Sequence, residues 1–314
     1  MAKLRDIKRR IKSVKNTAKI TRTMELIATA KAKTAQDRTH KALPYFEALA
    51  EIAGQAREAS GDDAGVVHPL LERREVKKVA VLVVVGNRGL CGGYNTNTLR
   101  MARDHRARLV AEGKEVRVFA SGKKAFGWFK FQKVPFEGNY TQFDDRPRFV
   151  DVERVADALM GLFQAGEVDR VDVVYTHYFS AGRQAPVIET MLPITSASEA
   201  QVAVRGGEGA PAAQGAPGVA AAHAKAGRAV VFTIEPDPRT ILDAIFPLQA
   251  RLHLFRVYLE AASSEQIARR VAMKNATDNA QEVGRLLRMA YNRGRQSQIT
   301  KEILEVLGGA EALA

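Results

Sequence analysis

The sequence predicts an α/β domain inserted between two long helices, which are expected to pair with each other as an antiparallel coiled coil. Apolar residues recur at three- and four-residue spacing near both ends of the chain, as they do on one face of a helix. Between these ends, short apolar runs typical of buried strands alternate with helical segments. With 314 residues and 46% hydrophobic residues, the chain is long enough for one large domain or two modest ones.

The C-terminal segment, residues 248–307, predicts one long helix. It contains no proline and only two glycines, Gly284 and Gly294. We expect one apolar face, formed by Leu248, Leu252, Phe255, Leu259, Ala262, Ile267, Val271, Ala276, Ala280, Val283, Leu287, Tyr291, Ile299, Ile303 and Val306. At 1.5 Å per residue, a continuous helix of this length would measure roughly 90 Å. Its apolar stripe therefore needs a partner along most of its length.

The N-terminal segment, residues 3–58, predicts the helix that covers this stripe. Its first apolar residues follow a heptad pattern: Leu4, Ile7, Ile11, Val14 and Ala18. We interpret Ile20, Met24 and Ile27 as a continuation after a shift of register, and we expect a kink or a break at Pro44. If both helices leave the same end of the α/β domain, they run antiparallel. We then expect the C-terminal helix to extend beyond Met1 from about Tyr291 onward.

The middle of the chain predicts a sheet with helices on its faces. The run from Lys78 to Val85 is almost entirely apolar and rich in valine, which is typical of a central parallel strand covered on both sides. Further strands are predicted at 116–120, 171–178, 186–194 and 230–234, with 186–194 antiparallel to 171–178. Helices are predicted at 96–112, 123–129 and 150–164. This alternation indicates a Rossmann-like α/β domain.

The predicted division of the chain is an N-terminal coiled-coil helix at 1–58, an α/β domain at 75–235 and a C-terminal coiled-coil helix at 238–314. Residues 205–228 are rich in glycine, alanine and proline. Because this composition cannot bury a core, we expect a flexible surface loop there.

The net charge of +13 favours an acidic partner. Residues 1–41 contain thirteen lysines and arginines but only three acidic residues, so this segment carries much of the excess. A solvated helix face explains such a run, as do contacts with nucleic acid, anionic lipid or an acidic protein surface. No apolar run approaches the ~20 residues of a membrane-spanning helix, and a single cysteine excludes an internal disulfide.

The sequence shows no pattern typical of an active site, a cofactor site or a metal site. The glycine-rich run at 86–93 follows a strand, where phosphate-binding loops occur, but it lacks both GxGxxG and a Gly-Lys-Ser/Thr sequence. We interpret it as a tight turn, with nucleotide binding as the alternative, and Cys91 within it as a packing residue. The six histidines have no metal-ligand spacing.

The last helix ends in the chain's most specific pattern, Ile299-Thr300-x-Glu302-x-x-Glu305-x-x-x-Gly309-Ala310-x-Ala312. This pattern resembles the C-terminal signature of the γ subunit of F-type ATP synthases. Further similarity lies at Tyr291-Asn292-Arg293-x-Arg295-Gln296, at Arg88-Gly89-Leu90-Cys91-Gly92-Gly93-Tyr94-Asn95, and in the first helix at Arg10-Ile11-Lys12-Ser13-Val14 and Met24. The resemblance covers nearly the whole chain. Asn87 and Glu25 depart from the family pattern.

The resemblance implies a central-stalk rotor with no active site and no cofactor of its own. Its partners would be the hexamer of α and β subunits, the ε subunit and the c-ring. It would lie peripherally on the cytoplasmic face of the bacterial plasma membrane. The same resemblance implies contacts with the β-subunit loops and the bore of the hexamer at Met24, Arg295, Gln296, Thr300 and Glu302, with Met24 at the height of the others.

Two other functions remain open on the residues alone. A basic coiled coil could bind nucleic acid, although the basic helix has no interleaved aromatic residues. A nucleotide-dependent α/β enzyme would require the 86–93 loop to hold phosphate.

Overall fold

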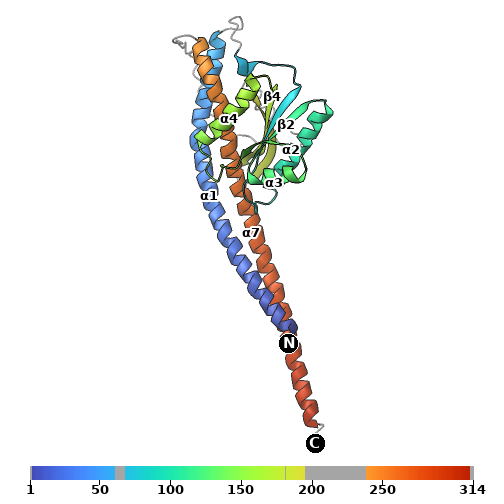
Figure 1. Ribbon diagram of the computed structural model, residues 1–314. Coiled ribbons are helices and arrows are strands. Elements are labelled where there is room, and N and C mark those ends of the chain that lie inside the picture. The colour runs from blue at the N-terminus through green and yellow to red at the C-terminus, as the bar shows by residue number, and fades with distance from the viewer. Residues whose placement is uncertain (1, 61–67, 181, 195–237, 312–314) are drawn as a thin grey trace. The chain divides into compact units, whose positions relative to one another are not determined.

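A computed structural model describes residues 2–60, 68–180, 182–194 and 238–311 (Figure 1). The chain divides into two compact units. Unit 1 comprises Met1–Thr34, Gly89–Gly93 and Glu265–Ala314, and unit 2 comprises Ala35–Arg88 and Tyr94–Ser264. The predicted loop at 205–228 and the predicted strand at 230–234 lie outside the described residues.

Unit 2 contains a five-stranded sheet in the order β3-β2-β1-β4-β5. The strands are β1 (Lys78–Val84), β2 (Glu115–Ser121), β3 (Glu137–Tyr140), β4 (Arg170–Ser180) and β5 (Arg183–Leu192). The pairs β1–β2, β1–β4 and β2–β3 are parallel, and β4–β5 is antiparallel. The predicted α/β fold and the antiparallel last pair are therefore confirmed, whereas the short edge strand β3 was not predicted.

Helices cover both faces of this sheet (Figure 1). The helices α2 (Tyr94–Ala111) and α3 (Lys123–Phe131) pack on the face that carries Val79, Val81 and Val83. The helix α4 (Phe149–Gln164) and part of α7 pack on the opposite face, with Ala80 and Leu82. The central strand β1 is thus buried on both sides, which is why its sequence is a continuous apolar run without alternation. A short 3-10 helix, η1 (Pro69–Leu71), precedes the sheet.

The two long helices are α1 (Ala2–Ser60) and α7 (Pro238–Glu311), and each contributes to both units. In unit 2 they run antiparallel, because Phe46 stacks edge-on against Phe255 while Thr39 Oγ1 lies 3.4 Å from Ser263 Oγ. We predicted a kink or a break at Pro44, and the break does not occur. Pro44 is exposed and lies inside a continuous helix, where the loss of one backbone hydrogen bond on the solvent side is tolerated.

Candidate functional site on the paired helices

In unit 1, α1 carries one uninterrupted heptad series that is withdrawn from solvent. The positions of this series are all buried or half-buried: Leu4, Ile7, Ile11, Val14, Ala18, Thr21, Glu25, Ala28 and Ala32. We call these residues the α1 seam. Its first half is aliphatic, and its second half consists mainly of small residues. Small side chains allow two helix backbones to approach closely.

The matching residues of α7 are also small at several positions. The α7 seam consists of Met273, Thr277, Ala280, Gly284, Leu287, Tyr291, Gly294 and Gln298. Thr277 Oγ1 donates a hydrogen bond to Thr21 Oγ1 at 2.8 Å. A Cβ atom added to Gly284 would lie 3.7 Å from Val14 Cγ1, and one added to Gly294 would lie 3.0 Å from Leu4 Cδ2. Residue numbers thus fall along α1 as they rise along α7, so the predicted antiparallel pairing is observed within unit 1.

Several large apolar residues lie on the outside of the helix pair, opposite to expectation. Ile20 is 61% exposed and Ile27 is 52% exposed, and Val271 and Val283 are exposed as well. The predicted shift of register after Ala18 was wrong: the heptad continues through Thr21 and Ala28. From Thr21 to Ala32 the α1 seam positions are small or polar, so a prediction from hydrophobicity alone chose the neighbouring isoleucines instead. Leu26, Leu286 and Met289 add to this exposed apolar surface.

The C-terminal turns of α7 extend beyond the start of α1. Leu4 lies beside Gly294, and α7 continues for nearly five more turns, to Glu311 (Figure 1). The exposed apolar side chains of this end are Ile299, Ile303, Leu304, Val306 and Leu307. A helix end of this composition presents an apolar surface to whatever surrounds it.

The predicted contact residues fall at two separate levels of unit 1. Thr21 contacts Thr277 across the helix pair. The half-buried Met24, almost one turn farther along α1, therefore lies beside the turn of α7 that precedes Thr277. Arg295 lies about 20 residues farther along α7, a separation of roughly 30 Å. The expectation that Met24 stands at the height of the C-terminal group was therefore wrong. The reason is that antiparallel pairing brings the first residues of α1, and not residue 24, beside residues 294–298.

The other four predicted residues do lie together. Arg295, Gln296, Thr300 and Glu302 are exposed within two turns of α7. Thr300 Oγ1 donates to the Gln296 carbonyl at 3.0 Å, and Gln298 Nε2 donates to Glu302 Oε1 at 2.9 Å. These bonds are local to the helix, and the four predicted side chains themselves are exposed.

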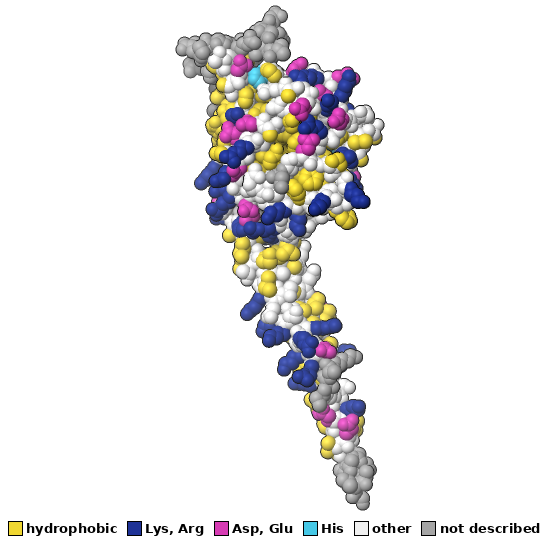
Figure 2. All heavy atoms as spheres, viewed as in Figure 1, with side chains coloured by type: hydrophobic (Ala, Val, Ile, Leu, Met, Phe, Trp, Pro, Cys, Tyr) yellow, Lys and Arg dark blue, Asp and Glu magenta, His cyan; other side chains and the backbone are white. Residues whose placement is uncertain are grey.

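Basic residues cover the outside of α1 in unit 1. Among the side chains described in its first 22 residues, the exposed cations are Arg5, Lys8, Arg9, Arg10, Lys12, Lys15, Lys19 and Arg22. Figure 2 shows lysine and arginine side chains along the helices of unit 1, with hydrophobic side chains between them. Arg22 pairs with Glu25 at 2.9 Å, and Arg9 lies 3.9 Å from Asp6. The basic residues outnumber these acidic partners, so the surface favours an acidic partner.

The loop at 89–93 packs on α7 in unit 1, a contact that the sequence pattern does not indicate. Arg269 Nη2 donates to the Gly89 carbonyl at 3.4 Å, and a Cβ atom on Gly92 would lie 3.7 Å from Ala272 Cβ. Leu90 and Gly92 have left-handed backbone torsions, with φ of 62° and 57°, as expected of a tight turn. Cys91 is buried, in keeping with a packing role.

Among the described residues, no cluster of three or more histidine, cysteine or acidic side chains has the arrangement of a metal site. Over the same residues, no helix is both long and apolar enough to cross a membrane.

Known proteins resemble this chain over its full length. The family model described as ATP synthase matches residues 3–313. An ATP synthase gamma chain of Leptospira biflexa is 42% identical over 316 residues, covering all of both chains. The gamma chain of Rhodopirellula baltica is also 42% identical, covering 100% of this chain and 99% of the relative.

Solved structures share the fold. A chain of the Euglena gracilis mitochondrial ATP synthase, in an assembly of OSCP, F1 and c-ring, has a TM-score of 0.64 at 19% identity and covers 99% of this chain and 95% of its own. A chain from the rotor of the same enzyme has a TM-score of 0.59 at 20% identity, with 95% and 99% covered. On the family match and the identity of its relatives, this chain belongs to the ATP synthase gamma chain family.

Proposed function

We propose that the chain is the central-stalk rotor of an F-type proton-translocating ATP synthase. In this role it turns with the membrane c-ring and forces the catalytic β subunits of the α/β hexamer through different conformations. The chemistry takes place in the hexamer, and the chain supplies no active site or cofactor. Membership in the gamma chain family supports this role.

The observation that carries the proposal is the inverted apolar pattern of unit 1. Small residues such as Thr21, Ala28 and Gly284 fill the seam between the helices, while Ile20, Ile27 and Val283 lie outside. Burial of such side chains contributes about 1.5–3 kcal/mol each, so an isolated helix pair gains nothing from exposing them. The pattern fits a helix pair that other subunits surround.

The surface charge of α1 suits a partner that must move. Long-range attraction between a basic surface and an acidic one does not depend on one register, because it acts through the summed field rather than through fixed contacts. A basic helix pair inside an acidic ring of loops is therefore attracted in many rotational positions.

We place the contacts with the β subunits at the two levels found in unit 1. Arg295, Gln296, Thr300 and Glu302 would meet the bore near the end of α7, beside its exposed apolar residues. Met24 would meet a second ring of loops about 30 Å away along the helix. Two separated levels of contact hold a rotating axle against tilting better than one.

Unit 2 would take the remaining partners, the ε subunit and the c-ring. We place the chain peripherally on the cytoplasmic face of the bacterial plasma membrane, held there by the complex. The predicted division into two coiled-coil helices, at 1–58 and 238–314, and an α/β domain at 75–235 is kept as part of this proposal.

Reconstitution tests the proposal. The chain is combined with α, β, ε and c-ring components from which the native γ subunit has been omitted, and the complex is inserted into vesicles. We expect ATP hydrolysis to drive proton uptake only when the chain is present, and a bead attached to unit 2 to rotate. A complex that assembles with the chain but hydrolyses ATP without rotation or proton uptake would contradict the proposal.

A further inference from the structure

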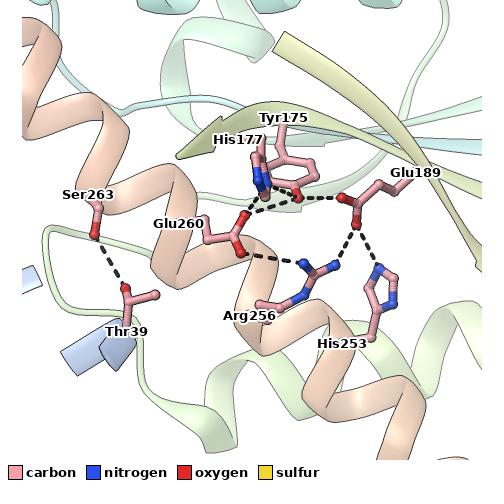
Figure 3. Close-up of polar contacts among 8 residues, drawn as sticks. All are labelled: Thr39, Tyr175, His177, Glu189, His253, Arg256, Glu260 and Ser263. Atoms are coloured by element: carbon pink, nitrogen blue, oxygen red, sulfur yellow. Dashed lines mark hydrogen bonds and ion pairs between the residues drawn. The ribbon is translucent and has the colours of Figure 1, made fainter. Parts of the chain in front are cut away.

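A cluster of six polar side chains lies between the β4–β5 pair and α7 within unit 2 (Figure 3). Two come from β4, one comes from β5 and three come from α7: Tyr175, His177, Glu189, His253, Arg256 and Glu260. Glu189 is only 5% exposed, Glu260 is buried and Tyr175 is fully buried. The proposed contacts with other subunits use none of these residues.

The members of the cluster pair with one another. Arg256 Nη2 donates to Glu189 Oε2 at 2.7 Å, and its Nη1 lies 3.4 Å from Glu260 Oε1. The Tyr175 hydroxyl donates to Glu189 Oε1 at 2.7 Å and lies 3.1 Å from Glu260 Oε2. His177 Nδ1 lies 2.6 Å from Glu260 Oε2, and His253 Nε2 lies 3.3 Å from Glu189 Oε2. Each carboxylate thus touches both the sheet and the helix.

Glu189 stays ionised across the physiological range. Burial raises the pKa of this carboxyl, but the contact with His253 and the charge of Arg256 outweigh burial, and its pKa falls to about 2. Burial, together with the nearby Glu260 and Glu189 charges, raises the pKa of Tyr175 well above its usual value, so the hydroxyl remains a donor. The cluster therefore combines the charges of Glu189 and Arg256 with a directed hydrogen bond from Tyr175 inside a protein core.

Stability alone does not explain a cluster of this kind. Removing charges from water is costly, and replacing a buried ion pair by apolar residues of similar volume is often neutral or stabilising. The surrounding interface is already apolar, since Leu254, Val257 and Ala261 of α7 are buried in the same core. Apolar burial is non-directional, however, and tolerates small rotations of a helix on a sheet.

The geometry of the cluster is directional. His253, Arg256 and Glu260 are spaced by three and four residues, so they share one face of α7. On the sheet, Glu189 is in register with Val173, which places it on the face that carries Tyr175. Turning α7 by one residue position, about 100°, would move all three of its side chains away from the sheet. The ionic contacts thus select one rotational position of the helix.

We infer that this cluster sets the rotational position of α7 on the β4–β5 sheet, so that the helix turns with unit 2 and does not slip against it. The inference rests on the proposed rotor function. Torque taken up by unit 2 leaves it through the chain segments that continue into unit 1, of which α7 is one. The six residues are positioning residues, since they act through the helix.

The test is a triple variant, Glu189→Gln with Arg256→Met and Glu260→Gln, in the reconstituted complex. It removes all three charges together and keeps side-chain volume nearly constant. We expect a melting temperature close to that of the wild type and sustained ATP hydrolysis, but severalfold fewer protons pumped per ATP against a proton gradient. The matched control is Arg251→Met, which removes the more exposed pair between α7 and Asp157 of α4 and should leave the pumping ratio unchanged.

The outcomes separate this inference from the rotor function. A triple variant that pumps as many protons per ATP as the wild type overturns the inference while leaving the rotor function intact. A triple variant that fails to fold also overturns it, because the cluster would then serve stability. If the wild-type complex itself does not pump, the rotor function fails. Arg256→Met alone leaves the buried carboxylates of Glu189 and Glu260 without their arginine partner, and we expect it to reduce the yield of folded chain.

Discussion

The two units differ in how much of their large apolar surface they bury. In unit 2, residues such as Phe246 and Leu254 are fully buried between helix and sheet, together with a paired ionic cluster. In unit 1, aliphatic residues such as Leu4 and Val14 fill one half of the contact between the helices and mainly small residues fill the other half, while further isoleucine, leucine and valine side chains face outward. Unit 2 therefore has its own core, whereas unit 1 leaves apolar surface for other subunits to cover.

The largest effect is expected when the same substitution, leucine to alanine, is made at two positions of α7. Leu254→Ala should lower the free energy of unfolding by about 2–5 kcal/mol, because it opens a cavity in the core of unit 2. Leu304→Ala, at an exposed position of unit 1, should change it by no more than about 0.5 kcal/mol. Urea titration of the purified chain measures both. Similar losses at the two positions would refute the contrast.

The ionic cluster predicts a loss of stability in acid. The pKa of Glu189 lies below its ordinary value of 4.5, at about 2, so the charged form contributes stability that is complete above about pH 4.5 and is lost as the pH falls toward 2. The shift corresponds to about 3 kcal/mol between the ionised and the protonated form of Glu189, a difference that arises because protonation leaves Arg256 with a weaker partner, and not between the whole cluster and an uncharged replacement. Glu189→Gln should remove this part of the pH dependence in urea titrations between pH 6 and pH 3. Glu282→Gln, in an exposed pair with Arg285, serves as the control and should change it little.

A large side chain placed in the seam of unit 1 should lower the free energy of unfolding, whereas large side chains already occur on the exposed faces of its helices. Gly284→Leu should destabilise the chain by about 1–3 kcal/mol, because the added atoms would meet Val14 across the seam. Gly284→Ala leaves an ordinary 3.7 Å contact and replaces a poor helix former, so it should stabilise by up to about 1 kcal/mol. Thermal unfolding followed by circular dichroism measures both. A stabilising leucine would mean that the helices do not approach closely there.

The smallest effect on folding is expected at Met24, where the effect on function should be large. Met24→Lys places a long cation at a half-buried position beside the seam, where its stem can extend to solvent, so stability should hardly change. In the complex, the cation could catch on an acidic loop of a β subunit, and we expect assembly to persist while ATP-driven proton pumping falls. Met24→Leu is the control. Normal pumping in the lysine variant would contradict a contact at this level.

Local patterns predicted most of the elements. The valine-rich run of β1 and the three- and four-residue spacing of the long helices identified strand and helix directly, and β5 was expected beside β4 in the observed orientation. The strand β3, whose sequence is Glu-Gly-Asn-Tyr, carries no such pattern. It contains Gly138 with φ of 68° and exists because the edge of β2 offers hydrogen bonds to it.

The sequence by itself determined that two long helices flank an α/β domain, because periodicity and strand propensity are properties of neighbouring residues. Only the tertiary structure decided which face of α1 meets α7. The seam holds Thr21 and Ala28 although Ile20 and Ile27 are more hydrophobic, since close backbone approach selects small residues. It also decided which charges meet: Glu189 and Arg256 are 67 residues apart and become partners only when α7 packs on the sheet.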